Sequence, residues 1–146
     1  MNLDAPFHLT LLATRDMIEQ GWGRIVMVSS TAGQVGGAAE SAYDASKHGL
    51  LGLMRSVAQD VAPFGVTCNA VLPGWVRTAM AERSAAEAAA RQGTDVEAVW
   101  AERAAVYPTG RVVTAEEVAA AITFLASEEA SGINGEAVTV ALGGVW

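Results

Sequence analysis

Several features that mark large classes of protein are scarce in this sequence. It has one cysteine, Cys68, so the chain cannot form an internal disulfide, and the surrounding apolar run VTCNAVL predicts a buried thiol. Its 9 lysine and arginine residues are outnumbered by 16 aspartate and glutamate residues, which gives a formal net charge of −7 and no basic stripe. Nucleic acids and anionic membrane surfaces are therefore not expected as partners.

Long apolar runs and metal-ligand patterns are also missing. No apolar run approaches the roughly 18 residues that a membrane-spanning helix requires, and the first residues lack the basic-then-apolar order of a signal peptide. We therefore expect a cytoplasmic protein that does not bind a membrane. The two histidines, His8 and His48, do not have the spacing of metal ligands, so we expect no metal site and place His48 at the surface or in an interface.

What the chain does contain is the alternation of helix and strand patterns typical of an α/β fold. With 146 residues, 51% of them hydrophobic, it is about the size of one domain. Apolar residues have helical spacing over 3–20 and 42–62. Short apolar runs at 24–28 and 66–72 predict strands buried on both faces of a parallel sheet, and a third strand is predicted at 137–140.

Three patterns of a serine or threonine followed three residues later by an acidic residue predict helix starts. The pair Ser41 and Asp44 predicts the start of the helix at 42–62. The run TDVE at 94–97 predicts a second start, and the pair Thr114 and Glu117 predicts a third.

The stretch with the most chemical content is SSTAGQVGGAAESAYDASK, at 29–47, where a predicted strand gives way to a glycine-rich loop and then a helix. Tyr43 and Lys47 are four residues apart and so share one face of that helix. A phenol is a poor acid or base near neutral pH because its ordinary pKa is about 10, but a neighbouring ammonium favours the phenolate. Ser30 can then hold a carbonyl or hydroxyl oxygen while the phenol transfers a proton. The alternative is that YDASK is only the first turn of an amphipathic helix.

This pattern resembles the active site of the short-chain dehydrogenase/reductase family, in which a serine lies thirteen residues before the tyrosine of a YxxxK motif. Asn2, in NLDAPF, lies where the family's catalytic asparagine lies. The run NAVLPGWVRTAM, at 69–80, is similar to the family's proline-glycine cofactor loop, and the segment 110–140 is similar to its closing helix and last strand. The resemblance covers nearly the whole chain.

The resemblance implies an NAD(P)-dependent oxidoreductase that interconverts a secondary alcohol and a ketone, with NAD or NADP as cofactor. Tyr43 would be the general acid/base, and Ser30 would orient the substrate oxygen. Lys47 would assist the tyrosine and hold the nicotinamide ribose, while Asn2 would support a water molecule that links Lys47 to solvent. The substrate would be a small carbonyl or alcohol, and a 3-oxoacyl or polyketide-type ketoreductase is the more specific interpretation.

The same resemblance assigns roles to the segments that follow. Four residues of the proline-glycine loop would contact the nicotinamide end of the cofactor: Pro73, Gly74, Val76 through its backbone, and Thr78 through its hydroxyl. The segment 79–109 would be a helical insertion that covers the substrate. In this insertion Trp100, Val106 and Tyr107 are candidate apolar lid residues, and they are equally candidates for anchors that hold the lid to the domain.

The front of the family's fold has no counterpart here, since there is no TGxxxGxG-like loop, no acidic residue ending a second strand and no NNAG-like turn. We therefore expect a single partial domain over 1–146, the C-terminal part of a doubly wound Rossmann-like parallel sheet whose N-terminal nucleotide-binding half is absent. Alone, it should be inactive and bind dinucleotides weakly; when complete, it should form a homo-oligomer, a dimer or a tetramer. The alternatives are a non-catalytic remnant that associates with related subunits, and a binding module without turnover.

One departure from the family's pattern lies near the end of the chain. The family's last strand commonly ends in an acidic or asparagine residue followed by two glycines, whereas Val140 is followed here by ALGG. The turn should therefore be shifted or bulkier, and the tail should not pack beside the substrate pocket as closely as in the family.

Overall fold

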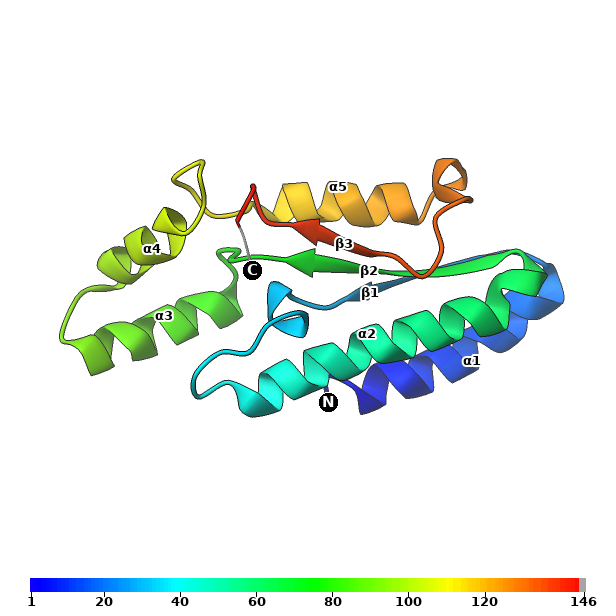
Figure 1. Cartoon of the computed structure of the whole chain (residues 1–146), viewed down its shortest axis with the longest axis horizontal. Coiled ribbons are helices and arrows are strands. Elements are labelled where there is room, and N and C mark those ends of the chain that lie inside the picture. The colour runs from blue at the N-terminus through cyan, green and yellow to red at the C-terminus, as the bar shows by residue number, and fades with distance from the viewer. Residues whose placement is uncertain (145–146) are drawn as a thin grey trace.

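The computed structural model describes residues 1–144 and arranges them around a three-stranded parallel sheet (Figure 1). The strands are β1 (Gly23–Val28), β2 (Val66–Pro73) and β3 (Ala137–Val140), and their order in the sheet is β1-β2-β3. The α-helices are α1 (Asp4–Gln20), α2 (Ser41–Val61), α3 (Ala79–Gln92), α4 (Val96–Ala105) and α5 (Ala115–Leu125). Short 3-10 helices cover Thr31–Gly33, Ala62–Phe64 and Glu128–Ala130.

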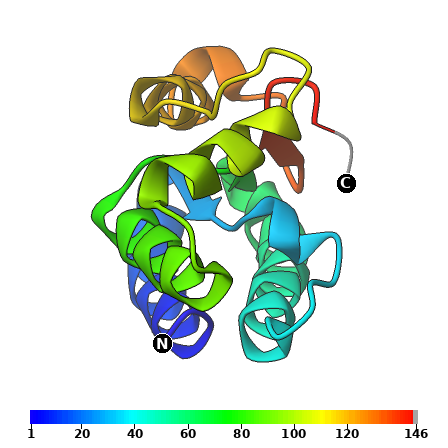
Figure 2. The same ribbon diagram turned by 90° about the vertical axis from the view of Figure 1, so that its left-hand side faces the viewer.

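The helices form layers on both faces of the sheet, as a doubly wound α/β fold requires. Helices α1 and α2 lie on one face and α5 lies on the other (Figure 1). Helices α3 and α4 lie beyond the carboxyl ends of the strands, and a view from that end shows them in front of the sheet (Figure 2). The insertion therefore stands over the edge of the sheet where open α/β folds bind their ligands.

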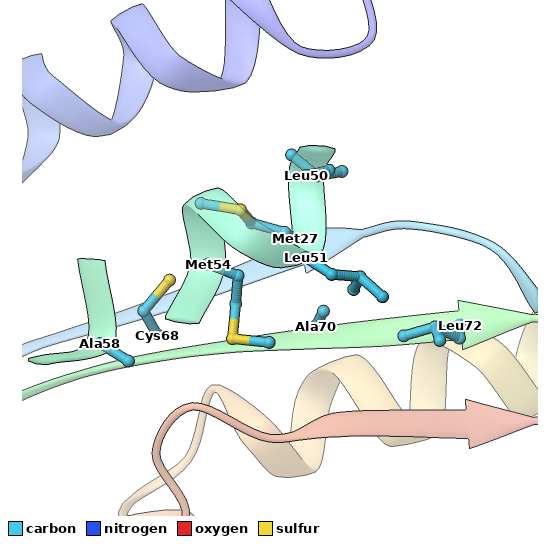
Figure 3. Packing of buried hydrophobic residues seen from close by; sticks show 8 residues of the cluster. All are labelled: Met27, Leu50, Leu51, Met54, Ala58, Cys68, Ala70 and Leu72. Atoms are coloured by element: carbon cyan, nitrogen blue, oxygen red, sulfur yellow. The ribbon is translucent and has the colours of Figure 1, made fainter. Parts of the chain in front are cut away.

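The central strand β2 and helix α2 form the main core. Positions 66–72 of β2 are all buried, as the sequence predicted for this strand. Its side chains pack against α2 and β1 in the cluster shown in Figure 3, which consists of Met27, Leu50, Leu51, Met54, Ala58, Cys68, Ala70 and Leu72. The prediction of a buried thiol is confirmed, because Cys68 is 0% exposed and burial raises its pKa to about 12.

Strand β1 is less buried than the sequence predicted. It pairs in parallel with β2, from Gly23 opposite Val66 to Val28 opposite Val71, and among residues 1–144 its other edge pairs with no strand. Val28, the last residue of the strand, is 47% exposed. The prediction of a strand buried on both faces is therefore wrong for β1, because an apolar run alone does not distinguish an edge strand from a central one.

Of the three predicted capping patterns, the structure confirms one. The hydroxyl of Thr114 accepts from the backbone N–H of Glu117, and the Glu117 carboxylate accepts from the backbone N–H of Thr114. At 94–97 the prediction is one residue early, because Asp95 caps α4 by accepting from the Ala98 N–H. The predicted pair of Ser41 and Asp44 is wrong, since α2 begins at Ser41 itself and no side chain caps it.

The turn after β3 packs on the end of the insertion. Leu142 and Gly143 have φ of 50° and 81°, and the Gly144 N–H donates to the Ala141 carbonyl at 2.7 Å. A Cβ atom built on Gly144 would lie 3.0 Å from the ring of Tyr107. The shifted turn thus lies against Tyr107 rather than in the cavity described below.

Candidate functional site

A cavity of about 980 Å³ opens at the carboxyl ends of β1 and β2, between α2 and α3. It is lined by residues from five segments of the chain: the end of β1 with the loop after it, the first turns of α2, the loop after β2, α3 and the start of α5. Of the predicted site residues, only Asn2 does not line this cavity. Those that line it are Ser30, Tyr43, Lys47, Pro73, Gly74, Val76 and Thr78. Residues that are 48 positions apart in the sequence therefore meet in one place.

Lys47 is held at the junction of β1 and α2. Its Nζ donates to the Val28 carbonyl at 3.0 Å and lies 5.6 Å from the centre of the Tyr43 ring. Burial lowers the pKa of Lys47, because desolvation penalises the charged ammonium. The spacing of four residues thus brings the ammonium next to the phenol, one helical turn apart.

The turn that carries Ser30 packs tightly against the Lys47 turn of α2. The Ser29 hydroxyl donates to the Lys47 carbonyl at 3.2 Å. A Cβ atom built on Gly33 would lie 2.9 Å from the Ser29 Oγ and 3.1 Å from the Lys47 carbonyl oxygen, so the close approach requires a glycine. The Ser30 Oγ accepts from the Ala32 N–H at 3.2 Å, and its hydroxyl proton is left to donate into the cavity.

Asp44 has a function in the site that the sequence analysis missed. Its side chain is 7% exposed, and its Oδ2 accepts from the Gly37 N–H at 2.7 Å, which ties the glycine-rich loop to α2. Its Oδ1 is buried and has no hydrogen-bond partner in the described part of the chain. The spacing from Ser41 suggested a helix cap, and no local pattern indicates a bond to a residue seven positions earlier.

The loop after β2 is fixed from both sides. The Gly74 N–H donates to the Val140 carbonyl at 3.0 Å, and the Trp75 N–H donates to the Tyr107 hydroxyl at 2.6 Å. A Cβ atom at Gly74 would lie 2.3 Å from that hydroxyl oxygen, so this contact requires a glycine. The next residue, Val76, pairs with Val113 in an isolated parallel bridge.

Thr78 starts helix α3 at the edge of the cavity. Its Oγ1 accepts from the Ala81 N–H at 3.2 Å, so the hydroxyl serves as the N-cap of α3. One acceptor lone pair is used in this way, and the hydroxyl proton can still donate to a ligand.

Asn2 lies outside the main cavity. Its side-chain Nδ2 donates to the Ser46 Oγ at 3.3 Å, and the Ser46 hydroxyl in turn donates to the Tyr43 carbonyl at 2.7 Å. Asn2 lines a second cavity of about 520 Å³ between α1 and β1, and Lys47 lines both cavities. Asn2 is therefore linked to the turn of α2 that carries Tyr43, through the backbone of that residue.

The insertion α3–α4 forms the wall of the cavity opposite α2. Trp100 and Tyr107 are 4% and 2% exposed, Val106 is 52% exposed, and none of the three lines the cavity. Trp100 packs against the alanine face of α3, and Tyr107 bonds to the loop after β2. The two aromatic residues are thus anchors of the insertion rather than lid residues that face a ligand.

The remaining expectations concern His48, metals and membranes. His48 is exposed, and its Nδ1 lies 2.9 Å from the Asp44 carbonyl oxygen. Residues 1–144 contain no cluster of three or more histidine, cysteine, aspartate or glutamate side chains arranged to bind a metal ion. Over the same residues, no helix combines the length and the apolar character needed to cross a bilayer.

Comparison with known proteins gives consistent matches over the whole chain. A family model described as enoyl-(acyl carrier protein) reductase matches residues 1–144. D-beta-hydroxybutyrate dehydrogenase of Cupriavidus necator is 41% identical over 138 residues, which is 92% of this chain and 53% of that protein. A putative ketoacyl reductase of the monensin polyketide synthase from Streptomyces virginiae is 42% identical over 141 residues, covering 95% of this chain and 54% of that protein.

Solved structures match equally well. A variant of actinorhodin polyketide ketoreductase, solved with NADPH, has a TM-score of 0.92 at 34% identity and covers 99% of this chain and 57% of its own. This chain spans about half the length of the curated relatives that it matches. The fold is thus that of the C-terminal part of a Rossmann-like dehydrogenase, and the chain belongs to the short-chain dehydrogenase/reductase family.

Proposed function

We propose that the chain carries the catalytic residues of an NAD(P)-dependent oxidoreductase that interconverts a secondary alcohol and a ketone. The observation that carries this proposal is the single cavity lined by Ser30, Tyr43, Lys47 and the loop 73–78. The cavity lies at the carboxyl ends of parallel strands, where ligands bind in this class of fold.

Three side chains divide the work of proton transfer. The phenol of Tyr43 donates a proton to the substrate oxygen in reduction and accepts it in oxidation. The Ser30 hydroxyl donates a hydrogen bond to the same oxygen and so orients the substrate, without transferring its proton. Lys47, 5.6 Å from the Tyr43 ring, stabilises negative charge on the phenol oxygen, and its ammonium has two further N–H groups beyond the one bound to Val28.

Asn2 supports this arrangement indirectly. Through Ser46 it steadies the turn of α2 that carries Tyr43, and it shares the smaller cavity with Lys47. Water in that cavity would connect the Lys47 ammonium to solvent.

The residues present fit the nicotinamide end of NAD or NADP. In residues 1–144 the backbone N–H of Val76 has no hydrogen-bond acceptor, and the Thr78 hydroxyl keeps a free proton, so both can bind a carboxamide oxygen. Tyr43 and Lys47 would hold the adjoining ribose, and Pro73 with Gly74 would pack beside the ring. When bound, the cofactor supplies the hydride.

Within this reaction class we favour a 3-oxoacyl or polyketide-type ketoreductase acting on a small carbonyl compound. The two polyketide ketoreductases above, together with the 3-oxoacyl-[acyl-carrier-protein] reductase FabG of Salmonella typhimurium at 38% identity, support this choice. The dinucleotide-binding loop would come from residues that precede the matched region in those relatives. An in-frame TGxxxGxG sequence upstream of the codon for Met1 would support that origin, and the chain alone would then be inactive.

The experiment that tests the function is Tyr43→Phe in a chimera. This chain is fused behind the preceding half of the Cupriavidus necator relative, and turnover of NADH or NADPH with a ketone is followed. Phenylalanine keeps the packing of the ring but removes the proton that must move, so the rate should fall roughly a hundredfold to ten-thousandfold with an unchanged melting temperature. Ser56→Ala, at an exposed position of α2 that lines neither cavity, serves as the control. A folded Tyr43→Phe chimera that retains more than about a tenth of the activity would contradict the proposal.

A second candidate function, association with like subunits, is favoured by the surface of α1. Four apolar side chains on this helix are 43–71% exposed, and they are Phe7, Leu9, Leu11 and Leu12. Phe7 and Leu11 are four residues apart and share one face of the helix, and Leu9 and Leu12 are three apart and share another. Exposed apolar faces mark interaction surfaces. We infer that α1 contributes to a homo-oligomer, a dimer or a tetramer.

Sedimentation velocity at tens of micromolar tests this second proposal. The wild-type chain should sediment as an associated species. Replacement of Leu9 and Leu12 by glutamate should shift it towards monomer, because like charges would then face each other across the interface. A monodisperse wild-type monomer at that concentration would contradict the association.

A further inference from the structure

The α3–α4 wall of the cavity contains a buried arginine whose charge no carboxylate neutralises directly. The side chain of Arg103 is 8% exposed and is stacked between two indole rings, 3.9 Å from the centre of Trp75 and 4.8 Å from that of Trp100. No ion pair within 4.0 Å involves it in residues 1–144. Burial lowers the pKa of Arg103, and longer-range attraction to Glu82 and Glu40 opposes this shift.

Arg103 does not line the cavity itself, but it polarises one hydroxyl group that does. Its Nη1 donates to the Ala81 carbonyl at 3.1 Å, and its Nη2 donates to the Ser84 Oγ at 3.0 Å. Both Ala81 and Ser84 line the cavity, while Arg103 lies behind them. Ser84 therefore presents to the cavity a hydroxyl that is polarised by a cation.

The Ser84 hydroxyl keeps its proton for a ligand. Serine and threonine inside helices usually donate to the carbonyl three or four residues earlier, as Thr14 does to Thr10 and Ser46 does to Tyr43. Ser84 makes no such bond within the part of the chain that the structure describes. Since one of its lone pairs accepts from Arg103, the group is fixed as a donor directed away from the guanidinium.

We propose that Ser84 binds a second oxygen atom of the substrate, beyond the reacting carbonyl, and that Arg103 is the positioning residue that prepares Ser84 as a donor. This inference rests on the proposed function, because it assumes that the reacting carbonyl lies at Tyr43 in the same cavity. The second oxygen is the carboxylate oxygen of an oxo acid or the carbonyl oxygen of its ester. Both are acceptors that gain from a charge-assisted donor in a cavity with largely apolar walls.

A purely structural role for Arg103 and Ser84 makes a different prediction. If the pair only joins α4 to α3, removal of the Ser84 hydroxyl should lower stability and affect all ligands equally. If Ser84 binds the second oxygen, its removal should change the preference between ligands. The informative quantity is therefore the affinity for a ligand with a second oxygen function divided by the affinity for a ligand without one.

The test is a titration of the 146-residue chain followed by ¹H–¹⁵N NMR, with acetoacetate, methyl acetoacetate and 2-pentanone as probes. The wild-type chain should bind acetoacetate and its ester, which carry a second oxygen function, more tightly than 2-pentanone, with shifts in residues 80–84. Ser84→Ala should weaken binding of those two probes roughly tenfold or more and leave 2-pentanone unchanged. Ser84→Thr should retain the preference, and Ser56→Ala, the same change at an exposed position of α2, should have no effect.

The two sources of the oxygen are separated by the same data. A larger loss for acetoacetate than for its ester in Ser84→Ala identifies a carboxylate, and equal losses identify a carbonyl. Arg103→Met should reduce the preference for acetoacetate over 2-pentanone even where α3 and α4 remain folded.

Two results would overturn the inference. One is a wild-type chain that shows no preference for acetoacetate and its ester over 2-pentanone, including one that does not bind them. The other is a Ser84→Ala variant with the wild-type ratio of affinities. Failure of the proposed function would appear in a different measurement, as a folded Tyr43→Phe chimera that keeps its turnover. The dependence on Ser84 is measured by binding and should be the same in the Tyr43→Phe variant of the 146-residue chain.

Discussion

The two walls of the cavity are held in place by different forces. The α2 wall, with Tyr43 and Lys47, continues into a helix whose Leu51 and Met54 pack into the main core against β2 (Figure 3). The α3–α4 wall has its own small core of alanines around Trp100 and lies beyond the ends of the strands (Figure 2). The residues proposed for chemistry thus share the stability of the sheet, whereas the residues proposed for substrate recognition depend on a satellite core.

The largest effect is expected in the core below the α2 wall. Met54 is 0% exposed, so Met54→Ala removes buried apolar atoms and leaves a cavity that should cost about 2–5 kcal/mol in the free energy of unfolding. Denaturation followed by circular dichroism measures this loss. The matched change Met80→Ala, at a side chain that is 62% exposed, should cost far less. Equal losses for the two variants would show that α2 is not the more firmly held wall.

A smaller and local effect is expected in the α3–α4 wall. Trp100→Leu removes the ring that stacks on Arg103 and the indole N–H that donates to Glu82 at 2.9 Å. This should cost about 1–3 kcal/mol and be confined to α3 and α4.

Hydrogen exchange distinguishes local from global loss in this variant. Protection should fall in α3 and α4 and remain in β2, because the satellite core can open without the sheet. Trp22→Leu, which removes a half-exposed indole at the opposite end of β1, should leave the protection of α3 and α4 unchanged. Uniform loss of protection in Trp100→Leu would mean that both walls unfold together.

The smallest effect concerns the start of α5, where Ala115 and Val118 complete the cavity. Arg111 binds both carboxylate oxygens of Glu117, at 2.7 and 3.0 Å, and with the backbone of Thr114 it lowers the pKa of Glu117 to about 2. A lowered pKa in the folded state means that this stabilisation is complete above the ordinary value of 4.5 and is lost as the pH falls through about 2.

NMR titration of the Glu117 carboxyl group checks this prediction. Arg111→Ala should raise the pKa of Glu117 towards its ordinary value, and the start of α5 should then fray at a higher pH. A Glu117 midpoint that does not respond to Arg111→Ala would show that the ion pair does not hold this helix start.

The parts of the site that sequence predicted are those set by short-range geometry. Helical spacing brings Tyr43 and Lys47 together, and the change from strand to loop places Ser30 in the cavity. The capping box joins Thr114 and Glu117, which are only three positions apart in the sequence. In each case the backbone conformation that the local sequence favours already places the side chains.

The parts that sequence did not predict depend on contacts between distant segments. Arg103 stacks on Trp75, 28 residues earlier, and neither residue belongs to a pattern that would indicate the pairing. Asp44 has the spacing of a cap, but its carboxylate is closer to the Gly37 N–H once the loop folds back. The exposure of β1 likewise depends on what lies beside it, which no property of its own residues encodes.

The burial of Cys68 has a practical consequence for measuring these opening motions. Burial raises the pKa of the Cys68 thiol to about 12, so the folded chain holds it protonated at neutral pH, and only the thiolate reacts with alkylating reagents. Cys68 lies in the middle of β2, beside Met54, so reagent can reach it only when the main core itself separates. The rate of Cys68 alkylation should therefore report how often the sheet opens, and it should not depend on opening of the α3–α4 wall.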